Sequence, residues 1–136
     1  MTEIPADIRD HNRKLVAEFR AAGRAFPGRA LLLLTTTGAK SGREHTTPMM
    51  YVEIDGRLLV IASNAGAQKH PDWFRNLVAH PSVTVEHAGE EFAATAVVPS
   101  GAERDRLFRE ITERYPFFAE HQAGVTRQIP VVELVR

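Results

Sequence analysis

A continuous run of strand-forming residues in the first third of the chain constrains the fold most strongly. Four leucines and then three threonines follow one another from Leu31 to Thr37. Such a run is typical of a buried strand. The sequence therefore predicts a strand over residues 31–37 that leads directly into a loop.

The segment after this strand has the composition of an anion-binding loop. Gly38 and Gly42 can adopt the positive φ values that turn successive backbone N–H groups inward. Lys40, Arg43 and His45 add positive charge, and an arginine also supplies a bidentate fork. These donors suit phosphate or carboxylate. An ordinary solvated hairpin loop is the alternative, because the Walker A order G-x-x-x-x-G-K-[ST] is absent from the sequence.

Composition narrows the class of protein. The 136 residues suffice for one domain with its own core. Because 17 basic residues balance 17 acidic ones, no net field attracts DNA, RNA or an anionic membrane, so an anion site must be local. The chain has no cysteine, which excludes disulfides, thiolate catalysis and thiolate metal sites. Without a signal peptide or an apolar run of membrane-spanning length, we expect a cytoplasmic protein with no integral membrane segment.

Apolar residues at helical spacing predict an amphipathic helix over about residues 7–22. Its apolar face consists of Ile8, Leu15, Val16 and Phe19. We favour the interpretation that this face packs on its own domain. A peripheral contact with a membrane surface is the other interpretation.

Two hairpins are predicted downstream. Apolar strands over residues 49–54 and 57–63 flank Asp55-Gly56, which is the sequence of a type I′ turn. Strands over residues 82–87 and 91–98 are joined through Ala88-Gly89-Glu90 as another hairpin.

Two helices are predicted between and after these hairpins. The first begins at Pro71 and ends at His80-Pro81, and the second opens at a capping box, Ser100 to Glu103, and ends at Tyr115-Pro116. Their predicted buried faces consist of Trp73, Phe74, Leu77 and Val78 in the first helix, and Leu107, Phe108 and Ile111 in the second.

The whole pattern indicates the fold class. Another helical turn is predicted from Tyr115 to His121, and a closing strand over residues 129–135. About six strands joined mainly by hairpins, with helices inserted between them, are typical of an α+β domain whose mostly antiparallel sheet curls into a barrel. We therefore predict a single domain over residues 1–136.

A loop of small residues between a strand and a helix is a second candidate site. Residues 62–70 lead into the helix, whose N-terminal N–H groups and dipole favour an anion by about 0.3–1 kcal/mol. Small residues also let a flat ring approach the backbone. Trp73 and Phe74 are interpreted mainly as core residues, whereas Ser63 and Asn76 are candidate ligands or, alternatively, polar cap or turn residues.

Three blocks of sequence, in order along the chain, carry a resemblance to a known family. The first is Leu-Leu-Thr-Thr-Thr-Gly-Ala-Lys-Ser-Gly-Arg with Pro48 downstream, and the second runs from Ala62-Ser63 to Pro71-x-Trp73-Phe74-x-Asn76-Leu77. The third combines Tyr115-Pro116 with Arg127-x-Ile129-Pro130-Val131. Together they resemble the deazaflavin-dependent nitroreductase family of mycobacteria and other actinobacteria.

This resemblance implies a split β-barrel fold of the flavin-reductase type and the cofactor coenzyme F420. That coenzyme is an 8-hydroxy-5-deazaflavin with a phosphodiester and a glutamate tail. Residues 30–136 would form the split-barrel coenzyme-binding domain, after an N-terminal helix within residues 1–25. The reduced coenzyme would deliver hydride to a small acceptor such as a quinone, a nitroaromatic compound or an enone.

The resemblance places the coenzyme phosphate on the first loop and the deazaflavin ring on the second. We add Arg43 to the contacts that the resemblance implies, because it carries positive charge in the first loop. The predicted coenzyme-binding residues are Ala39, Lys40, Ser41, Arg43, His45, Thr46, Thr47, Pro48, Met49, Met50, Ile61, Ala62, Ser63, Asn64, Asp72, Trp73, Phe74, Arg75, Asn76 and Phe118.

The C-terminal aromatic segment is the predicted acceptor site. Tyr115 is the candidate for acceptor binding or proton donation, assisted by Ser63, and a packing role at a helix end is its alternative. The predicted acceptor contacts are Met50, Tyr115, Phe118 and His121. Some relatives differ at these and nearby positions. They have an arginine where this chain has His45, a lysine where it has Asn64, and tyrosines where it has Met50, Phe118 and His121.

The chemistry needs no protein nucleophile. A deazaflavin carries the hydride itself, so the protein must orient the ring, exclude water and polarise the acceptor. The sequence contains no H-E-x-x-H, no G-x-S-x-G and no clustered metal ligands, and its six histidines are scattered. We therefore expect an oxidoreductase without a metal. The alternatives are an FMN-dependent reductase of the same fold, and a deazaflavin-binding storage protein without turnover.

Overall fold

One antiparallel sheet organises the protein. The computed structural model describes residues 8–26 and 28–136, and the seven strands are β1 (Leu31–Thr37), β2 (Glu44–Met50), β3 (Val52–Ile54), β4 (Arg57–Ile61), β5 (Ser82–His87), β6 (Glu90–Val97) and β7 (Val131–Val135). Their order in the sheet is β2-β1-β5-β6-β7-β4-β3, and every neighbouring pair is antiparallel.

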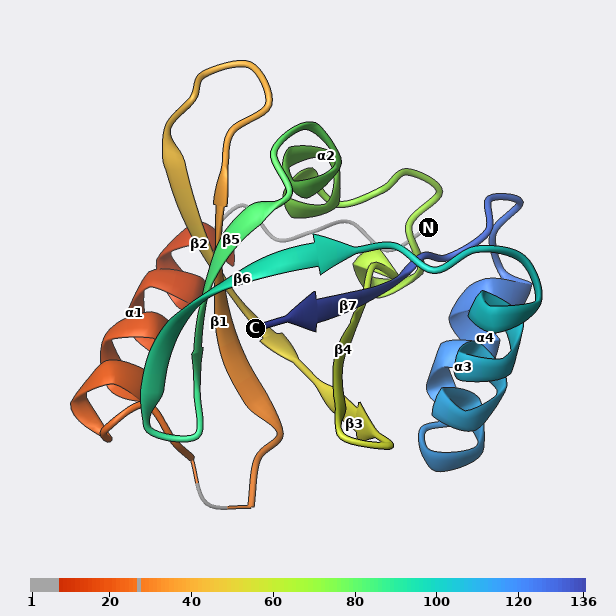
Figure 1. The fold of residues 1–136 in the computed structure, drawn as a ribbon, viewed down its shortest axis with the longest axis horizontal. Helices are drawn as coiled ribbons and strands as arrows, with labels where there is room; N and C mark the ends of the chain where they lie inside the picture. Colours follow the sequence, from red (N-terminus) through yellow and green to blue (C-terminus); the bar gives the residue numbers. More distant parts are fainter. Residues whose placement is uncertain (1–7, 27) are drawn as a thin grey trace.

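The two ends of this sheet come together. Only Tyr51 separates β2, at one end of the strand order, from β3, at the other, and β2 also contacts β4. The sheet therefore curls into a barrel that is split between β2 and β4 (Figure 1). The predicted α+β class and split β-barrel are confirmed.

The first loop is shorter than the sequence predicted. We expected residues 44–48 in the loop and a strand over residues 49–54, but β2 already begins at Glu44 and is separate from β3. Pro48 lies inside β2, opposite Leu33. A proline lacks the N–H that a central strand needs, but β2 has a strand on one side only in the sheet order, so the missing donor is tolerated there. The loop proper is limited to residues 38–43.

Both hairpins form, and the type I′ turn predicted at Asp55-Gly56 is confirmed; the second turn is one residue shorter than predicted, because β6 begins at Glu90. Asp55 and Gly56 have φ values of 53° and 75°, and Ala88 and Gly89 have values of 51° and 81°. Two consecutive positive φ values are the mark of a type I′ turn, whose twist matches that of the flanking strands.

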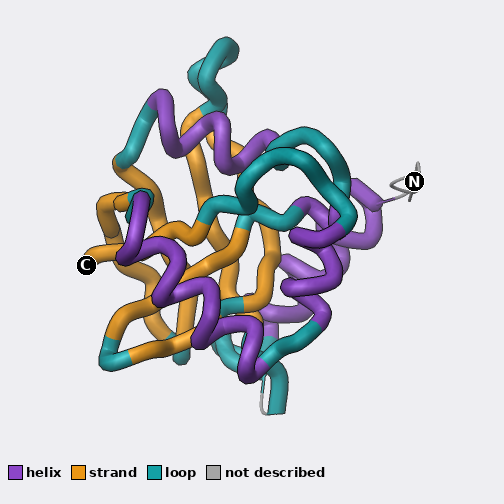
Figure 2. Tube along the Cα trace, turned by 90° about the vertical axis from the view of Figure 1, so that its right-hand side faces the viewer, coloured by secondary structure: helices purple, strands orange, loops and turns teal. Residues whose placement is uncertain are grey.

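Helices surround the barrel. They are α1 (Ile8–Ala21), α2 (Asp72–Ala79), α3 (Gly101–Arg114) and α4 (Phe117–Ala123), with a short 3-10 turn, η1 (Asn64–Gly66), before α2. In Figure 1, α1 lies on the left, α3 and α4 on the right, and α2 at the top beside the β1–β2 loop. Figure 2 shows the same arrangement from the side of α3 and α4. Among the described residues, no helix combines the length and the apolar character needed to cross a membrane.

Alternation along β4 divides the interior into two cores. Leu59, Val60 and Ile61 are all buried, and successive side chains of a strand point to opposite faces. Val60 belongs to the core inside the barrel with Leu32, Leu34, Leu77, Val83, Val85, Ala94, Ala96, Val132 and Leu134. Leu59 and Ile61 belong to an outer core with Val52, Ile54, Leu107, Phe108, Ile111, Phe118, Ile129 and Val131, which α3 and α4 cover.

Two details of the predicted helices are wrong. Val78 is 60% exposed, because it lies about 140° around the helix from Trp73, outside the apolar stripe. α3 begins where predicted, but Ser100 makes no side-chain capping hydrogen bond. Glu103 instead accepts a 2.7 Å hydrogen bond from Arg57, so the capping box does not form.

α1 is attached to the barrel by apolar contact and by a buried carboxylate. Phe19 is fully buried, in agreement with the predicted packing face, whereas the predicted helix start at Asp7 lies outside the described residues. Glu86 on β5 is 2% exposed and accepts two 2.9 Å hydrogen bonds from Arg20 and one of 3.1 Å from Arg24. These bonds, chiefly those from Arg20, hold the pKa of Glu86 below its usual value against the opposing effect of burial.

We predict that Glu86→Gln lowers the free energy of unfolding at pH 7 by about 1.5–3 kcal/mol, the usual contribution of hydrogen bonds to a charged group. Because the folded-state pKa lies below the unfolded value, the contribution is present above the unfolded pKa and is lost as pH falls through the folded pKa. The free energies of unfolding of the parent protein and Glu86→Gln, measured with urea, should therefore become equal in acid. Glu91→Gln, at an exposed partner of Arg24, is the control and should change stability little. An equal loss in the two variants would contradict the role of Glu86.

Candidate functional site

A groove of about 950 Å³ runs between α1, the β1–β2 loop and α2. The groove collects predicted coenzyme-binding residues from both candidate loops, namely Ala39, Lys40, Ser41, His45, Thr46, Thr47, Asp72, Trp73, Arg75 and Asn76. It also includes residues that were not among the predicted coenzyme contacts, namely Asn12, Arg13 and Val16 of α1, with Gly38 and Glu44. Arg43 is exposed but does not line the groove.

Several cationic side chains at the groove are not neutralised by an acidic residue in the described part of the chain. Lys40 and Arg75 are exposed and form no ion pair within the described part of the chain. Arg13 forms an ion pair with Asp10 on its own helix, at 3.3 Å, and none with another described residue. Exposed cations that are not neutralised by the protein can attract an anionic ligand.

The loop that carries Lys40 is tightly turned. The N–H of Gly38 donates to the carbonyl of Arg43 at 2.7 Å. Positive φ is found at Gly42, with 71°, but not at Gly38, so the prediction for Gly38 is wrong: closing the loop uses its N–H. A Cβ at Gly38 would lie 2.5 Å from the Ser41 hydroxyl oxygen and 3.1 Å from Nε2 of His45. Glycine at this position therefore lets two polar side chains converge on the backbone.

Asn76 connects this loop to α2. Its Oδ1 accepts a 3.0 Å hydrogen bond from the N–H of Ala39, and its Nδ2 donates to the hydroxyl of Thr36 at 3.2 Å. Asn76 is 8% exposed and Thr36 is 1% exposed. The amide thus fixes the position of the loop relative to α2, in addition to lining the groove.

Further predicted coenzyme contacts lie along the split of the barrel. Met49 and Met50 are on β2, whereas Ile61 ends β4 and Ser63 follows it. β2 leads away from the groove, and its contact with β4 brings these two segments together across the split. The structure therefore places the predicted residues in two adjoining regions, the groove and the split, rather than in one pocket.

Arg127 holds the second loop from the C-terminal side. Its guanidinium donates to the carbonyls of Ala62 at 3.1 Å, Ser63 at 2.8 Å and Ala67 at 3.1 Å. It also lies 3.1 Å from Nδ1 of His70. Burial, and then the charge of Arg127, lowers the pKa of His70, and burial lowers that of Arg127 itself. The sequence showed Arg127 only as part of a family block, because no local pattern reveals a partner more than fifty residues away.

The aromatic segment lies beside this loop. α4 contacts η1, and a Cβ at Gly66 would lie only 3.5 Å from Cδ2 of His121. The rings of Phe117 and Phe118 are 5.7 Å and 6.0 Å from that of His121. Nδ1 of His121 is buried and has no hydrogen-bond partner among the described residues. Tyr115, half-buried at the end of α3, packs on the same outer core as Met50.

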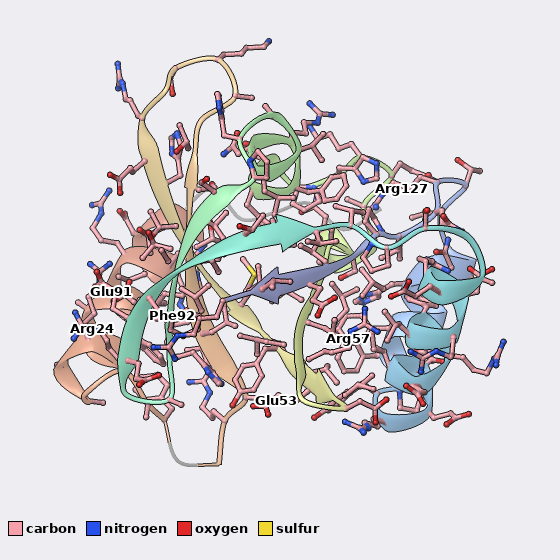
Figure 3. The ribbon with its side chains drawn as sticks, viewed as in Figure 1. Arg24, Glu53, Arg57, Glu91, Phe92 and Arg127 are labelled. Atoms are coloured by element: carbon pink, nitrogen blue, oxygen red, sulfur yellow. The ribbon has the colours of Figure 1, made fainter. Side chains whose placement is uncertain are left out.

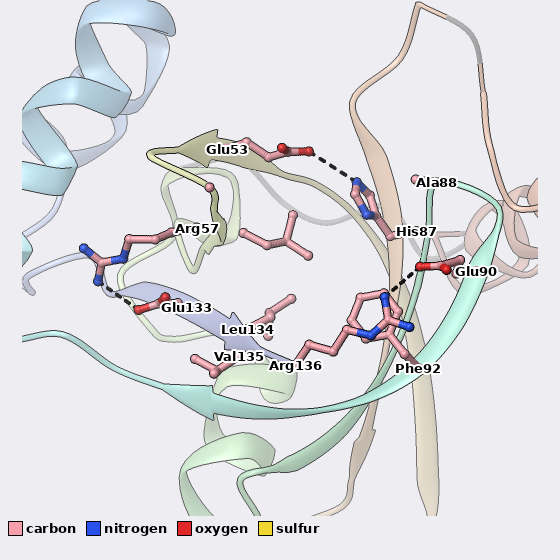
Figure 4. Close-up of a pocket in the computed structure, with 12 residues that line it drawn as sticks. Glu53, Arg57, His87, Ala88, Glu90, Phe92, Glu133, Leu134, Val135 and Arg136 are labelled. Atoms are coloured by element: carbon pink, nitrogen blue, oxygen red, sulfur yellow. Dashed lines mark hydrogen bonds and ion pairs between the residues drawn. The ribbon is translucent and has the colours of Figure 1, made fainter.

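A second cavity, of about 400 Å³, opens at another part of the barrel (Figure 4). Two ion pairs border it, Arg57 with Glu133 at 2.8 Å and Arg136 with Glu90 at 2.7 Å, and Oε1 of Glu53 lies 3.7 Å from Nε2 of His87. No predicted site residue lines this cavity. Figure 3 shows Arg57, at this cavity, well apart from Arg127.

The chain is similar to known proteins over most of its length. A model of the F420H(2)-dependent quinone reductase family matches residues 8–135. An F420H(2)-dependent quinone reductase of Mycobacterium tuberculosis is 35% identical over 118 residues, which cover 84% of this chain and 79% of that protein.

Two solved structures are also similar. An F420-H2 dependent reductase is 39% identical with a TM-score of 0.69, and the match covers 78% of this chain and 94% of that chain. A domain-swapped dimer is 34% identical with a TM-score of 0.73, and covers 93% of this chain and 96% of that chain.

We predict that Asn76→Ala loosens the first loop and costs about 1–3 kcal/mol of stability, because the buried Thr36 hydroxyl and the Ala39 N–H lose their partner. Hydrogen exchange of the amides in residues 38–43 should accelerate more than that of the β5–β6 hairpin. Val78→Ala, at an exposed position of the same helix, is the matched control and should alter neither quantity appreciably. Unchanged exchange in Asn76→Ala would show that the loop does not depend on this side chain.

Proposed function

We infer that this chain, which belongs to the F420H(2)-dependent quinone reductase family, is an oxidoreductase that uses reduced coenzyme F420 to transfer hydride to a quinone. One structural observation carries the assignment of the site. Coenzyme-binding residues predicted from separate segments of sequence gather along a groove that adjoins the split between β2 and β4.

The residues present fit the chemical groups of the coenzyme. Its phosphodiester and glutamate tail are anionic, and the groove offers the cationic side chains of Lys40, Arg75 and Arg13 together with the hydroxyl of Ser41. We propose that the phosphodiester binds at Lys40 and Ser41 and that the ring extends along β2 into the split. Because α1 contributes Arg13 and Asn12 to the groove, we include α1 with the barrel in a single coenzyme-binding domain.

The bound coenzyme supplies the hydride, and the chain has to orient the ring, exclude water and activate the acceptor. The apolar outer core next to the split, with Phe118 at 5% exposure, provides a surface from which water is excluded. A quinone carbonyl that gains hydride also needs hydrogen-bond donors or a proton. We propose Tyr115 for this role, with the Ser63 hydroxyl and the unpartnered Nδ1 of His121 as further polar contacts.

The same residues bear on the wider range of acceptors. Phe118 and His121 replace tyrosines of some relatives, and Met50 replaces a third. We propose that the absence of these tyrosines makes nitroaromatic compounds poorer acceptors than quinones, because the site then has fewer hydroxyl groups that can donate a hydrogen bond to a nitro group. Enones share the carbonyl of a quinone and belong in the same test.

The experiment that tests the proposed function has two stages. The purified protein is titrated with coenzyme F420, and reoxidation of the reduced coenzyme is then followed with quinones, nitroaromatic compounds and enones. Binding together with quinone turnover supports the proposal. Binding without turnover of any acceptor would indicate a storage protein, and a yellow protein with a flavin spectrum would indicate FMN in place of the deazaflavin.

We predict that Lys40→Ala weakens coenzyme binding by about ten- to a hundredfold, because one charge-assisted hydrogen bond contributes roughly 1.5–3 kcal/mol. Fluorescence titration measures this change. The affinity of the parent protein should also fall with added salt, since Lys40 is exposed. Lys14→Ala is the matched control, because Lys14 lies on α1 but does not line the groove. If Lys40→Ala and the parent protein bind the coenzyme with equal affinity, the proposed phosphate site at this loop is wrong.

We predict that Tyr115→Phe lowers kcat/KM for quinones and leaves coenzyme affinity nearly intact, because only a hydroxyl is removed. That hydroxyl has no hydrogen-bond partner within residues 8–26 and 28–136, so the loss should not appear as unfolding. Steady-state kinetics with the reduced coenzyme measures the effect. Tyr51→Phe, at the chain's only other tyrosine, controls for loss of a hydroxyl in the barrel core. Parental rates on every acceptor would assign Tyr115 a packing role alone.

A further inference from the structure

We propose that Arg127 is a positioning residue for the coenzyme ring, because it fixes the orientation of the peptide groups between β4 and α2. This proposal rests on the proposed function, since it concerns the same coenzyme. It assigns a role to a side chain at the opposite side of the loop from the ring, and it predicts which part of the coenzyme that side chain affects.

The contacts of Arg127 are made almost entirely with backbone oxygen atoms. Its Nη1 donates to the carbonyl of Ala62, its Nη2 to that of Ser63 and its Nε to that of Ala67. An arginine that serves only to balance charge would face a carboxylate, but no acidic partner of Arg127 exists in the described part of the chain. The planar fork of a guanidinium is suited to holding several acceptors in one fixed arrangement.

This arrangement determines where the amide hydrogens of the loop point. In a trans peptide the C=O of one residue and the N–H of the next point in opposite directions, and none of the described peptide bonds is cis. Because the carbonyls of Ala62 and Ser63 face Arg127, the N–H groups of Ser63 and Asn64 face away from it. Neither N–H has an acceptor within the described residues. Two adjacent, unused donors are thereby presented on the side opposite Arg127.

The backbone of the loop supports the same conclusion. Ser63 is in the right-handed helical region, with φ −75° and ψ −24°, and Asn64 follows with a φ of 49°. Such a pair of conformations brings successive N–H groups toward one point and favours an oxygen atom with negative charge. Positive φ in a residue other than glycine is unfavourable by itself, so external contacts must maintain it. Arg127 supplies three of these contacts.

Arg127 is itself held in place by a buried network. The side chain of Gln122 donates to the carbonyl of Arg127 at 2.7 Å and accepts from the N–H of Ile129 at 2.8 Å. Arg104, 6% exposed, donates to the carbonyl of Ile129 at 2.6 Å and 3.2 Å. α3 and α4 therefore fix the segment that carries Arg127, and Arg127 in turn fixes the loop.

The ligand chemistry follows from the donors. Two convergent amide groups match the carbonyl-bearing pyrimidine edge of a deazaflavin, where negative charge can reside, and they lie outside the groove that holds Lys40. Arg127 should therefore influence binding of the ring, whereas Lys40 should influence binding of the phosphodiester. These two contributions can be measured separately.

The test compares Arg127→Ala, Arg127→Lys and Lys40→Ala for binding of two probes: intact coenzyme F420, and its deazaflavin chromophore without the phosphodiester tail. We expect Arg127→Ala to weaken both probes by the same factor, about tenfold or more, the loss of at least one hydrogen bond. Lys40→Ala should weaken the intact coenzyme only. Arg127→Lys keeps the charge but not the fork, so it should restore little of the affinity.

A readout without any ligand completes the test. In Arg127→Ala, the amides of residues 62–68 should exchange hydrogen faster while those of residues 38–43 keep the parental rate. Arg57→Ala is the matched control: this arginine makes ion pairs at the second cavity and should lower stability without altering chromophore affinity. All titrations are made at a temperature at which each variant is folded.

The outcomes separate this proposal from the proposed function. If the parent protein binds neither probe, the proposed function fails, while the exchange experiment still tests whether Arg127 holds the loop. If the parent binds and Arg127→Ala binds the chromophore as tightly as the parent does, Arg127 is not a positioning residue. Loss of chromophore affinity in Arg57→Ala equal to that in Arg127→Ala would overturn the proposal too, because general destabilisation would then explain both.

Discussion

Burial of β4 on both faces is the constraint on which the rest of the structure depends. Val60 needs an apolar partner inside the barrel, and Leu59 and Ile61 need one outside it. A sheet with a single covered face cannot satisfy all three, so the sheet must close and α3 and α4 must cover its outer surface. The end of β4, with Ala62 and Ser63, consequently lies where the two cores meet and where the barrel is split. The proposed ring site follows from that position.

The two loops of the site share a second constraint. Loops cannot satisfy their backbone hydrogen-bonding groups by pairing as strands do, and groups removed from water need other partners. The side chain of Asn76 provides one for the first loop, and the guanidinium of Arg127 provides three for the second. Asn76 lies on α2, whereas Arg127 lies in the connection between α4 and β7, which Gln122 and Arg104 hold through the carbonyls of Arg127 and Ile129. The loops are therefore positioned by the core, although they lie at its surface.

The charged side chains fall into two groups: buried ones that stabilise the fold, and exposed ones that are free to bind a ligand. Glu86 is buried and accepts hydrogen bonds from both Arg20 and Arg24. It therefore stabilises the attachment of α1 and is not available to bind a ligand. Lys40 and Arg75 are exposed in the groove and retain their hydrogen-bonding capacity. In a chain with no net charge, local separation of this kind is what the proposed anion site requires, since it needs no general affinity for anions.

Sequence alone determined the features that depend on neighbouring residues. The buried strand over Leu31–Thr37, the type I′ turn at Asp55-Gly56 and the bounds of α2 and α3 follow from local propensity and turn chemistry, and the structure agrees with them. The family resemblance selected ten of the residues that line the groove, on the β1–β2 loop, β2 and α2. Tertiary structure alone decided that Pro48 lies in an edge strand, that Glu103 binds Arg57 instead of capping α3, and that α1 lines the groove. It also decided that Arg127 binds carbonyls sixty or more residues away, because such contacts arise only when the closed barrel brings distant segments together.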